Sequence, residues 1–219
     1  MKKIKFYLFF SLAISIVSCS TKNETLTAAD LPIIGQHDIV YEAMDGYEVG
    51  DTIFHTVNPW EFTTDDSLLF QSSSIDDKLW IANFFFSYCP TVCVPMNKEM
   101  KKVNEELAEY DDKIAFLSFS IDEKRDTPSR LKTYRKKLDF TAKNWYFFTG
   151  NQDEIIDVAI HDFQILANED DSAPGGFIHS SSLVLVDKDK HIRGIYDTQF
   201  PEHMKQIVLD VKLLLDENK

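Results

Sequence analysis

The sequence predicts one α/β domain, in which a mixed central sheet is flanked by helices and preceded by an N-terminal β-strand extension. Between Leu79 and Phe163, apolar runs of strand length alternate with segments of helical periodicity. This alternation is typical of parallel strands joined by right-handed crossovers. Two further apolar runs around a polar turn add an antiparallel pair near the C-terminus. At 219 residues, the chain is expected to hold a single domain.

The first eighteen residues have the pattern of a bacterial lipoprotein signal peptide. Three lysines precede an apolar run from Phe6 to Val17 that contains no acid, and Ser18 and Cys19 follow. The run is short for a membrane span, and a small residue before a cysteine marks a cleavage point. We expect residues 1–18 to be removed and Cys19 to be lipidated. The alternative is an uncleaved anchor, and both interpretations predict a membrane-anchored protein on the periplasmic side.

Charge and cysteine content narrow the functions that this chain can have. Removal of residues 1–18 takes away three lysines and no acid, which moves the formal net charge from -13 to -16. So acidic a chain is not expected to bind nucleic acid. Once Cys19 is lipidated, Cys89 and Cys93 are the remaining cysteines. A disulfide that closes so short a loop stabilises little, so the pair is expected to serve chemistry.

The part of the chain before the core is expected to hold a tether and a few edge strands. Residues 19–32 lack apolar periodicity and are interpreted as a flexible linker, which leaves residues 33–219 as the folded domain. Short apolar pieces at 39–41, 52–57, 62–64 and 68–71 predict strands on one edge of the sheet. Asp65 and Asp66 are suited to the turn of a hairpin between the last two pieces.

The core begins with the phenylalanine-rich strand Leu79–Phe86, whose nearly unbroken apolar sequence predicts burial on both faces. The helix that follows has its apolar stripe at Met96, Met100, Val103 and Leu107. A second buried strand, residues 113–121, ends at Asp122. The remaining predicted elements are a helix opened by Thr127 and Pro128, a strand at 144–149, a helix capped by Asn151, a hairpin of 183–186 with 191–196, and a helix from Pro201.

Cys89 and Cys93 lie at the junction between the first core strand and its helix. They are four residues apart, so their sulfurs would share one face if the first helical turn included both. A helix N-terminus favours thiolate over thiol. Two neighbouring thiolates can hold a soft metal ion or form a disulfide. A dithiol after the first buried strand of such a pattern suggests a thioredoxin-like fold.

His179 is the best candidate for a third member of this site. It lies in a predicted loop of glycines and serines, residues 175–182, just before the hairpin strand that begins near Leu183. That strand is expected to lie beside Leu79–Phe86, which would bring His179 to the cysteines. The other histidines, His37, His55, His161, His191 and His203, are interpreted as surface or packing residues.

Three motifs in order give the chain a specific resemblance to a known family. They are the phenylalanine-rich strand followed by Cys89-Pro-Thr-Val-Cys93, the segment Ser120-Ile-Asp-Glu-Lys-Arg-Asp-Thr-Pro128, and His179-Ser180 followed by a strand and Asp187. From about residue 32 to 215 the chain resembles the Sco/SenC family of copper-binding proteins, which assemble the binuclear copper centre of cytochrome c oxidase. The resemblance implies a thioredoxin-like fold with Cys89, Cys93 and His179 as copper ligands. Thr91 and Val94 depart from the aspartate and proline that the family often has.

The chemistry of these ligands agrees with the resemblance. Two thiolates and one imidazole suit copper. Structural zinc normally takes four ligands, and no fourth cysteine or histidine has suitable spacing. Asp122, at the end of the neighbouring strand, is expected either to orient a ligand or tune the site from behind, or to be a solvated acid.

The leading functional hypothesis is a membrane-tethered copper chaperone rather than an enzyme. Its expected partners are the copper-bearing subunit of cytochrome c oxidase, whose cysteines it could also reduce, a copper donor protein, and the lipid membrane. The alternative is a thiol-disulfide oxidoreductase, with Cys89 attacking and Cys93 resolving. Against it, such enzymes generally have two residues between the cysteines and a facing cis-proline, whereas here there are three residues. A copper or redox sensor is a third hypothesis.

Overall fold

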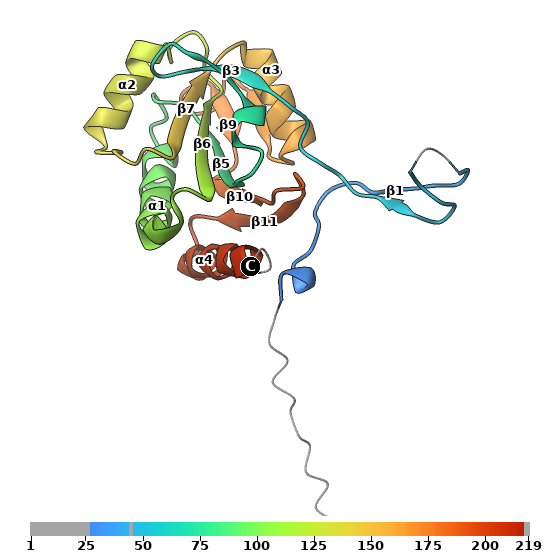
Figure 1. The fold of residues 1–219 in the computed structure, drawn as a ribbon. Coiled ribbons are helices and arrows are strands. Elements are labelled where there is room, and N and C mark those ends of the chain that lie inside the picture. Colours follow the sequence, from blue (N-terminus) through green and yellow to red (C-terminus); the bar gives the residue numbers. More distant parts are fainter. Residues whose placement is uncertain (1–26, 44–45, 217–219) are drawn as a thin grey trace, which may run out of the picture.

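The computed structural model describes residues 27–43 and 46–216 (Figure 1). The predicted signal peptide and Cys19 lie outside these residues. Within the described part of the chain, no helix is long and apolar enough to cross a membrane.

A seven-stranded mixed sheet forms the centre of the molecule, in the order β11-β10-β5-β6-β7-β3-β4. The strands are β3 (Glu61–Thr64), β4 (Leu69–Gln71), β5 (Leu79–Phe85), β6 (Ile114–Ser120), β7 (Trp145–Thr149), β10 (Ser182–Val186) and β11 (Ile192–Asp197). β5, β6 and β7 are parallel, and β10 pairs antiparallel with both β5 and β11. The predicted mixed α/β sheet is therefore confirmed.

In the part of the chain that the structure describes, four α-helices flank this sheet: α1 (Cys93–Glu106), α2 (Pro128–Lys137), α3 (Gln152–Asp157) and α4 (Pro201–Asp216). Three short 3-10 helices accompany them, η1 (Ala28–Asp30), η2 (Ser72–Ile75) and η3 (Ala108–Tyr110), and α3 continues into a π-helical turn, Val158–Asp162. α1 packs beside α4, and α4 lies along β11 (Figure 1). The predicted caps form, because the Thr127 and Asn151 side chains accept hydrogen bonds from Arg130 and Glu154 amides.

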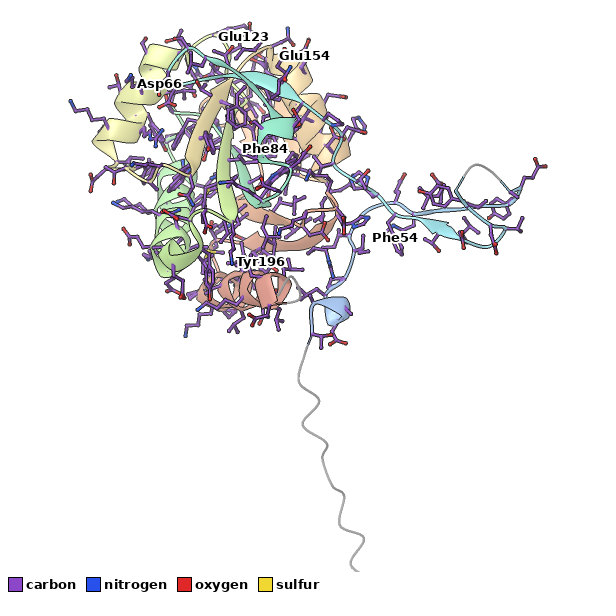
Figure 2. The ribbon with its side chains drawn as sticks, viewed as in Figure 1. Phe54, Asp66, Phe84, Glu123, Glu154 and Tyr196 are labelled. Atoms are coloured by element: carbon purple, nitrogen blue, oxygen red, sulfur yellow. The ribbon has the colours of Figure 1, made fainter. Side chains whose placement is uncertain are left out.

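Aromatic packing explains why the strands are so rich in phenylalanine. The Phe119 ring lies between Phe84 and Phe148, with ring centroids 5.1 and 5.0 Å away. Figure 2 shows Phe84 in the middle of the body. The predicted stripe of α1, Met96, Met100, Val103 and Leu107, is buried as expected. Because large side chains are buried on both faces of β5 and β6, these two strands form a closely packed, rigid part of the core.

The predicted N-terminal strands only partly join the sheet. β3 and β4 form a hairpin on its edge beside β7, as expected. β1 (Asp38–Ile39) and β2 (Thr52–Ile53) instead pair only with each other and project from the body as a separate arm (Figure 1). The prediction of one edge extension is wrong for this arm, because its apolar side chains are too few to be buried against the core. Ile39 is 52% exposed.

Part of the segment interpreted as a flexible linker, residues 28–32, contacts the folded body. Ala28 is fully buried, and the Arg193 guanidinium donates hydrogen bonds of 2.6 and 2.9 Å to the Ala28 and Leu31 carbonyls. Residues 28–32 therefore belong to the folded body. Local composition could not indicate this, since the contact is made by a residue of β11.

The topology brings three chain segments to one end of the sheet. β5 and β6 run parallel, so the segments after Phe85 and Ser120 leave the sheet at the same end, where these strands have their carboxyl termini. β10 runs antiparallel to β5, so the residues that precede Ser182 lie at that end too. Part of the predicted glycine-serine loop is a strand, β9 (Phe177–His179), which pairs with β8 (Ala167–Glu169) outside the main sheet.

Candidate metal centre

Cys89, Cys93 and His179 come together at this end of the sheet. One sulfur from each cysteine and one imidazole nitrogen all lie within 4.8 Å of one another. The Cys93 Sγ is 3.1 Å from the His179 Nε2. Both cysteines are free thiols; Cys93 is buried, whereas Cys89 is partly exposed. The sequence-predicted ligand residues therefore form one cluster with an accessible side.

The two cysteines belong to different local structures. α1 begins at Cys93, and Cys89 lies in the preceding turn, where its amide donates a hydrogen bond of 3.2 Å to the Phe86 carbonyl. The first helical turn therefore holds Cys93 but not Cys89. The sulfurs still approach each other, because the turn folds the chain back over the end of β5.

His179 is held in the tautomer that a metal ligand requires. Its Nδ1 lies 2.8 Å from the Ser180 carbonyl oxygen, which can only accept, so Nδ1 carries the proton. In the neutral ring, Nε2 then has a free lone pair, and that atom faces Cys93. Gly175 lets this segment pass close to Phe86, since a Cβ on Gly175 would lie 2.6 Å from the Phe86 ring.

The two thiols differ in their electrostatics. Burial raises the pKa of Cys93 above its ordinary value, and the neighbouring Cys89 adds to the rise. The hydrogen bond from Cys93 lowers the pKa of Cys89 far below its ordinary value, against the opposing effect of burial, and Thr91 contributes a further hydrogen bond. At neutral pH the pair therefore holds one proton, and the more exposed sulfur is the thiolate.

Asp126 supports the site, although sequence reasoning did not single it out. Its fully buried carboxylate accepts hydrogen bonds from the Ser87 amide at 2.7 Å, the Ser87 hydroxyl at 2.5 Å and the Ser120 hydroxyl at 2.6 Å. These contacts tie the turn that carries Cys89 to the end of β6. The serines that follow or end two buried strands were the signal that could have indicated a shared acceptor.

Asp122 is neither solvated nor in contact with the cluster. It is 1% exposed, and its carboxylate accepts hydrogen bonds from the Arg125 amide and side chain. Arg125 in turn donates a 2.6 Å hydrogen bond to the Gly175 carbonyl, and its guanidinium lies over the Phe86 and Phe177 rings. Asp122 therefore positions Arg125, which holds the segment that leads to His179.

The donor set fits copper. Two thiolates and one imidazole are soft to intermediate ligands, which copper accepts in low coordination number. Among the described residues, no further cysteine or histidine joins the cluster to complete the four ligands of structural zinc. A second group, Asp187, Asp189 and His191, lies in the β10–β11 turn, and there Arg193 already pairs with Asp187 at 2.9 Å.

Fold and site together define a thioredoxin-like protein that presents a dithiol and an imidazole at one end of its sheet. The SCO1/SenC family profile matches residues 50–215. The chain belongs to this family.

The similar proteins share most of the domain. The SCO1 protein homolog of Bacillus subtilis is 29% identical over 175 residues, which cover 78% of this chain and 88% of the relative. The SCO2-like protein of Rickettsia felis is 27% identical over 84% of this chain and 85% of its own length. The crystal structure of a SCO1/SenC family lipoprotein from Bacillus anthracis is 29% identical and aligns with a TM-score of 0.66 over 74% of this chain and 95% of its own.

Proposed function

We propose that this protein binds copper through Cys89, Cys93 and His179 and passes it to the copper-bearing subunit of cytochrome c oxidase during oxidase assembly. The observation that carries the proposal is the clustering of two sulfurs and one free imidazole nitrogen within 4.8 Å. Support comes from a solved structure, 29% identical with a TM-score of 0.64, of BsSco, a member of the Sco family of cytochrome c oxidase assembly proteins.

The proposed transfer is an exchange of ligands between two proteins. Cys89 is the accessible thiolate, so a partner's thiolate would approach the metal on the side of Cys89. In this proposal Cys89 is also the last ligand to release the metal. Cys93 is buried, and with His179 it completes the proposed set of ligands. Copper is the cargo of this reaction, and such a carrier needs an open site rather than an enclosed substrate pocket.

His179→Ala tests the ligand set. The variant should bind Cu(I) about tenfold more weakly, or worse, because one of three donors is lost while both thiols remain. Anaerobic competition with a Cu(I) chelator measures the affinity, and oxidase activity in cells reports assembly. His161→Ala is the matched control, since the His161 side chain is exposed, lies outside the cluster and pairs with Asp157 at 3.4 Å. If His179→Ala keeps the parental copper affinity and supports full oxidase assembly, the proposed three-ligand site is refuted.

The second candidate function is thiol-disulfide exchange, in which Cys89 attacks and Cys93 resolves. The lowered pKa of Cys89 beside a protonated, buried Cys93 favours it. Against it, the described residues contain no cis peptide bond, so no cis-proline faces the dithiol. Reduction of insulin disulfides by the reduced protein measures this activity. Rapid turnover together with weak copper binding would favour the oxidoreductase over the carrier.

We further propose that the domain is tethered to a membrane outside the cytoplasm through a lipidated Cys19, after removal of residues 1–18. The similar Bacillus anthracis protein is a lipoprotein. Cys19→Ser should abolish lipidation and leave the precursor uncleaved. Mass spectrometry that finds an unmodified Cys19 in processed protein would refute the tether.

A further inference from the structure

Helix α2 carries a concentration of positive charge that contrasts with the rest of the chain. The formal net charge is -13, yet Pro128–Lys137 contains no acid and five basic residues, Arg130, Lys132, Arg135, Lys136 and Lys137. Lys132 and Arg135 pair with Asp66 and Asp65. Among the described residues, Arg130, Lys136 and Lys137 have no acidic partner within salt-bridge distance. This helix therefore presents uncompensated positive charge.

A cavity lies between this helix and residues that neighbour the two cysteines in the sequence. It has a volume of about 160 Å³. Ser87 and Val94 line one side, and they flank Cys89 and Cys93 in the sequence. Arg130, Tyr134 and Lys137 line the other side. A group bound in this cavity would therefore contact the segments that carry the two cysteines, with two cations in its wall.

The Arg130 side chain is held in place, but its terminal nitrogens remain available as hydrogen-bond donors. Its Nε donates a 2.8 Å hydrogen bond to the Ser87 hydroxyl, and its guanidinium lies 4.4 Å from the centre of the Tyr88 ring. The two terminal nitrogens have no hydrogen-bond partner in the described part of the chain. A guanidinium with fixed orientation and free terminal donors suits a carboxylate, which can accept from both nitrogens at once.

We propose that this cavity binds a carboxylate side chain of the protein that exchanges ligands with the dithiol, in a segment where an aspartate or glutamate lies near the partner's own cysteine. The proposal rests on the proposed function, because it needs a partner thiolate at Cys89. Charge complementarity supports this occupant. An acidic segment is repelled by most of this acidic molecule, so the cations of the cavity would direct it to the face that carries Cys89.

The test uses the full chain with Cys19→Ser, so that Cys89 and Cys93 are its only thiols. The probes are two synthetic peptides, each with one cysteine held as a mixed disulfide with thionitrobenzoate. One has glutamates on both sides of the cysteine, and the other has glutamines. The Cys89 thiolate attacks the peptide sulfur, a Cys89–peptide disulfide forms, and thionitrobenzoate leaves with the electron pair of the broken bond. Its absorbance gives the rate.

The glutamate peptide should react about three- to tenfold faster than the glutamine peptide at low ionic strength, and added salt should reduce the difference. Lys137→Gln and Arg130→Gln should each remove most of this preference. Lys136→Gln is the matched control, because it removes the same charge from the same helix at a position outside the cavity, and it should keep the preference.

Equal rates for the two peptides, or an equal loss in Lys136→Gln and Lys137→Gln, would overturn the proposal. Self-association of the parent protein that Arg130→Gln abolishes would overturn it as well, since a second copy would then be the occupant. Copper affinity is measured on the same samples. Failure to bind copper contradicts the proposed function, whereas normal copper binding without glutamate preference contradicts this inference alone.

Discussion

At the scale of single residues, burial makes two identical side chains chemically different. Cys93 is 1% exposed and belongs to α1, whereas Cys89 lies in the turn before it and is partly exposed. A buried sulfur favours the neutral thiol, and a sulfur that accepts hydrogen bonds favours the thiolate. The proton therefore stays on Cys93, and in the proposed function Cys89 is the nucleophile or the leading metal ligand.

Alkylation with iodoacetamide should reveal this difference in the reduced Cys19→Ser chain. The rate at an ordinary thiol rises about a hundredfold between pH 6 and 8, because the thiolate fraction rises until the pH reaches the pKa of about 8.5. Since the pKa of Cys89 is lowered, it is already a thiolate at pH 6, and its rate should change less than about twofold. Cys93 should react slowly throughout. Mass spectrometry of the labelled peptides measures both rates.

The unfolded chain in urea provides the control for this profile, because there both cysteines should show the ordinary steep rise. A folded Cys89 with the same steep rise would mean that its thiolate is not stabilised by the hydrogen bond from Cys93.

At the scale of elements, the site depends on contacts between loops rather than on one helix. The β6–α2 loop reaches the segment before β9 through Arg125, whose guanidinium donates to the Gly175 carbonyl. Asp122 orients that guanidinium from the end of β6. His179 ends β9, so its position relative to the cysteines depends on this link.

Arg125→Gln should weaken Cu(I) binding about three- to tenfold, because the segment that carries His179 loses its anchor while all three donors remain. Lys124→Gln is the matched control, since the neighbouring Lys124 makes only an exposed ion pair with Glu169 at 3.6 Å. Competition with a Cu(I) chelator measures both variants. Equal affinities in the two variants would show that Arg125 does not position the ligand.

At the scale of the whole molecule, the aromatic core and the mixed sheet hold the reduced protein together without help from a disulfide. Both described cysteines are free, and the loop between them is too short for a bridge to constrain the unfolded chain strongly. Copper, in contrast, would bind the native cluster and find no equivalent arrangement in the unfolded chain.

Cu(I) should therefore stabilise the reduced protein by mass action, by about 2.7 kcal/mol at a free concentration one hundred times its Kd. Oxidation of the dithiol should change the free energy of unfolding much less. Urea unfolding of the apo, copper-loaded and oxidised forms measures the three values. A large loss of stability on reduction alone would indicate a structural disulfide and weaken the carrier proposal.

Local patterns in the sequence were sufficient for the order of the elements and for the expectation that Cys89, Cys93 and His179 lie together. The unbroken apolar run before Cys89 predicted β5, the stripe from Met96 to Leu107 predicted the buried face of α1, and the hairpin strand predicted to lie beside β5 brought His179 to the cysteines. These predictions succeeded because periodicity and capping are properties of neighbouring residues. The candidate site residues could be predicted because each lies next to the end or the start of a predicted strand or helix.

Only the tertiary structure decided which polar side chains support the site and that residues 28–32 are anchored to the body. The Ser87–Asp126 hydrogen bond joins residues 39 apart, and the Arg193–Ala28 hydrogen bond joins residues 165 apart. The same holds for the environments of the two sulfurs, since burial depends on everything that packs around them. No local pattern encodes such contacts, because each depends on how the sheet brings segments that are distant in the sequence close together.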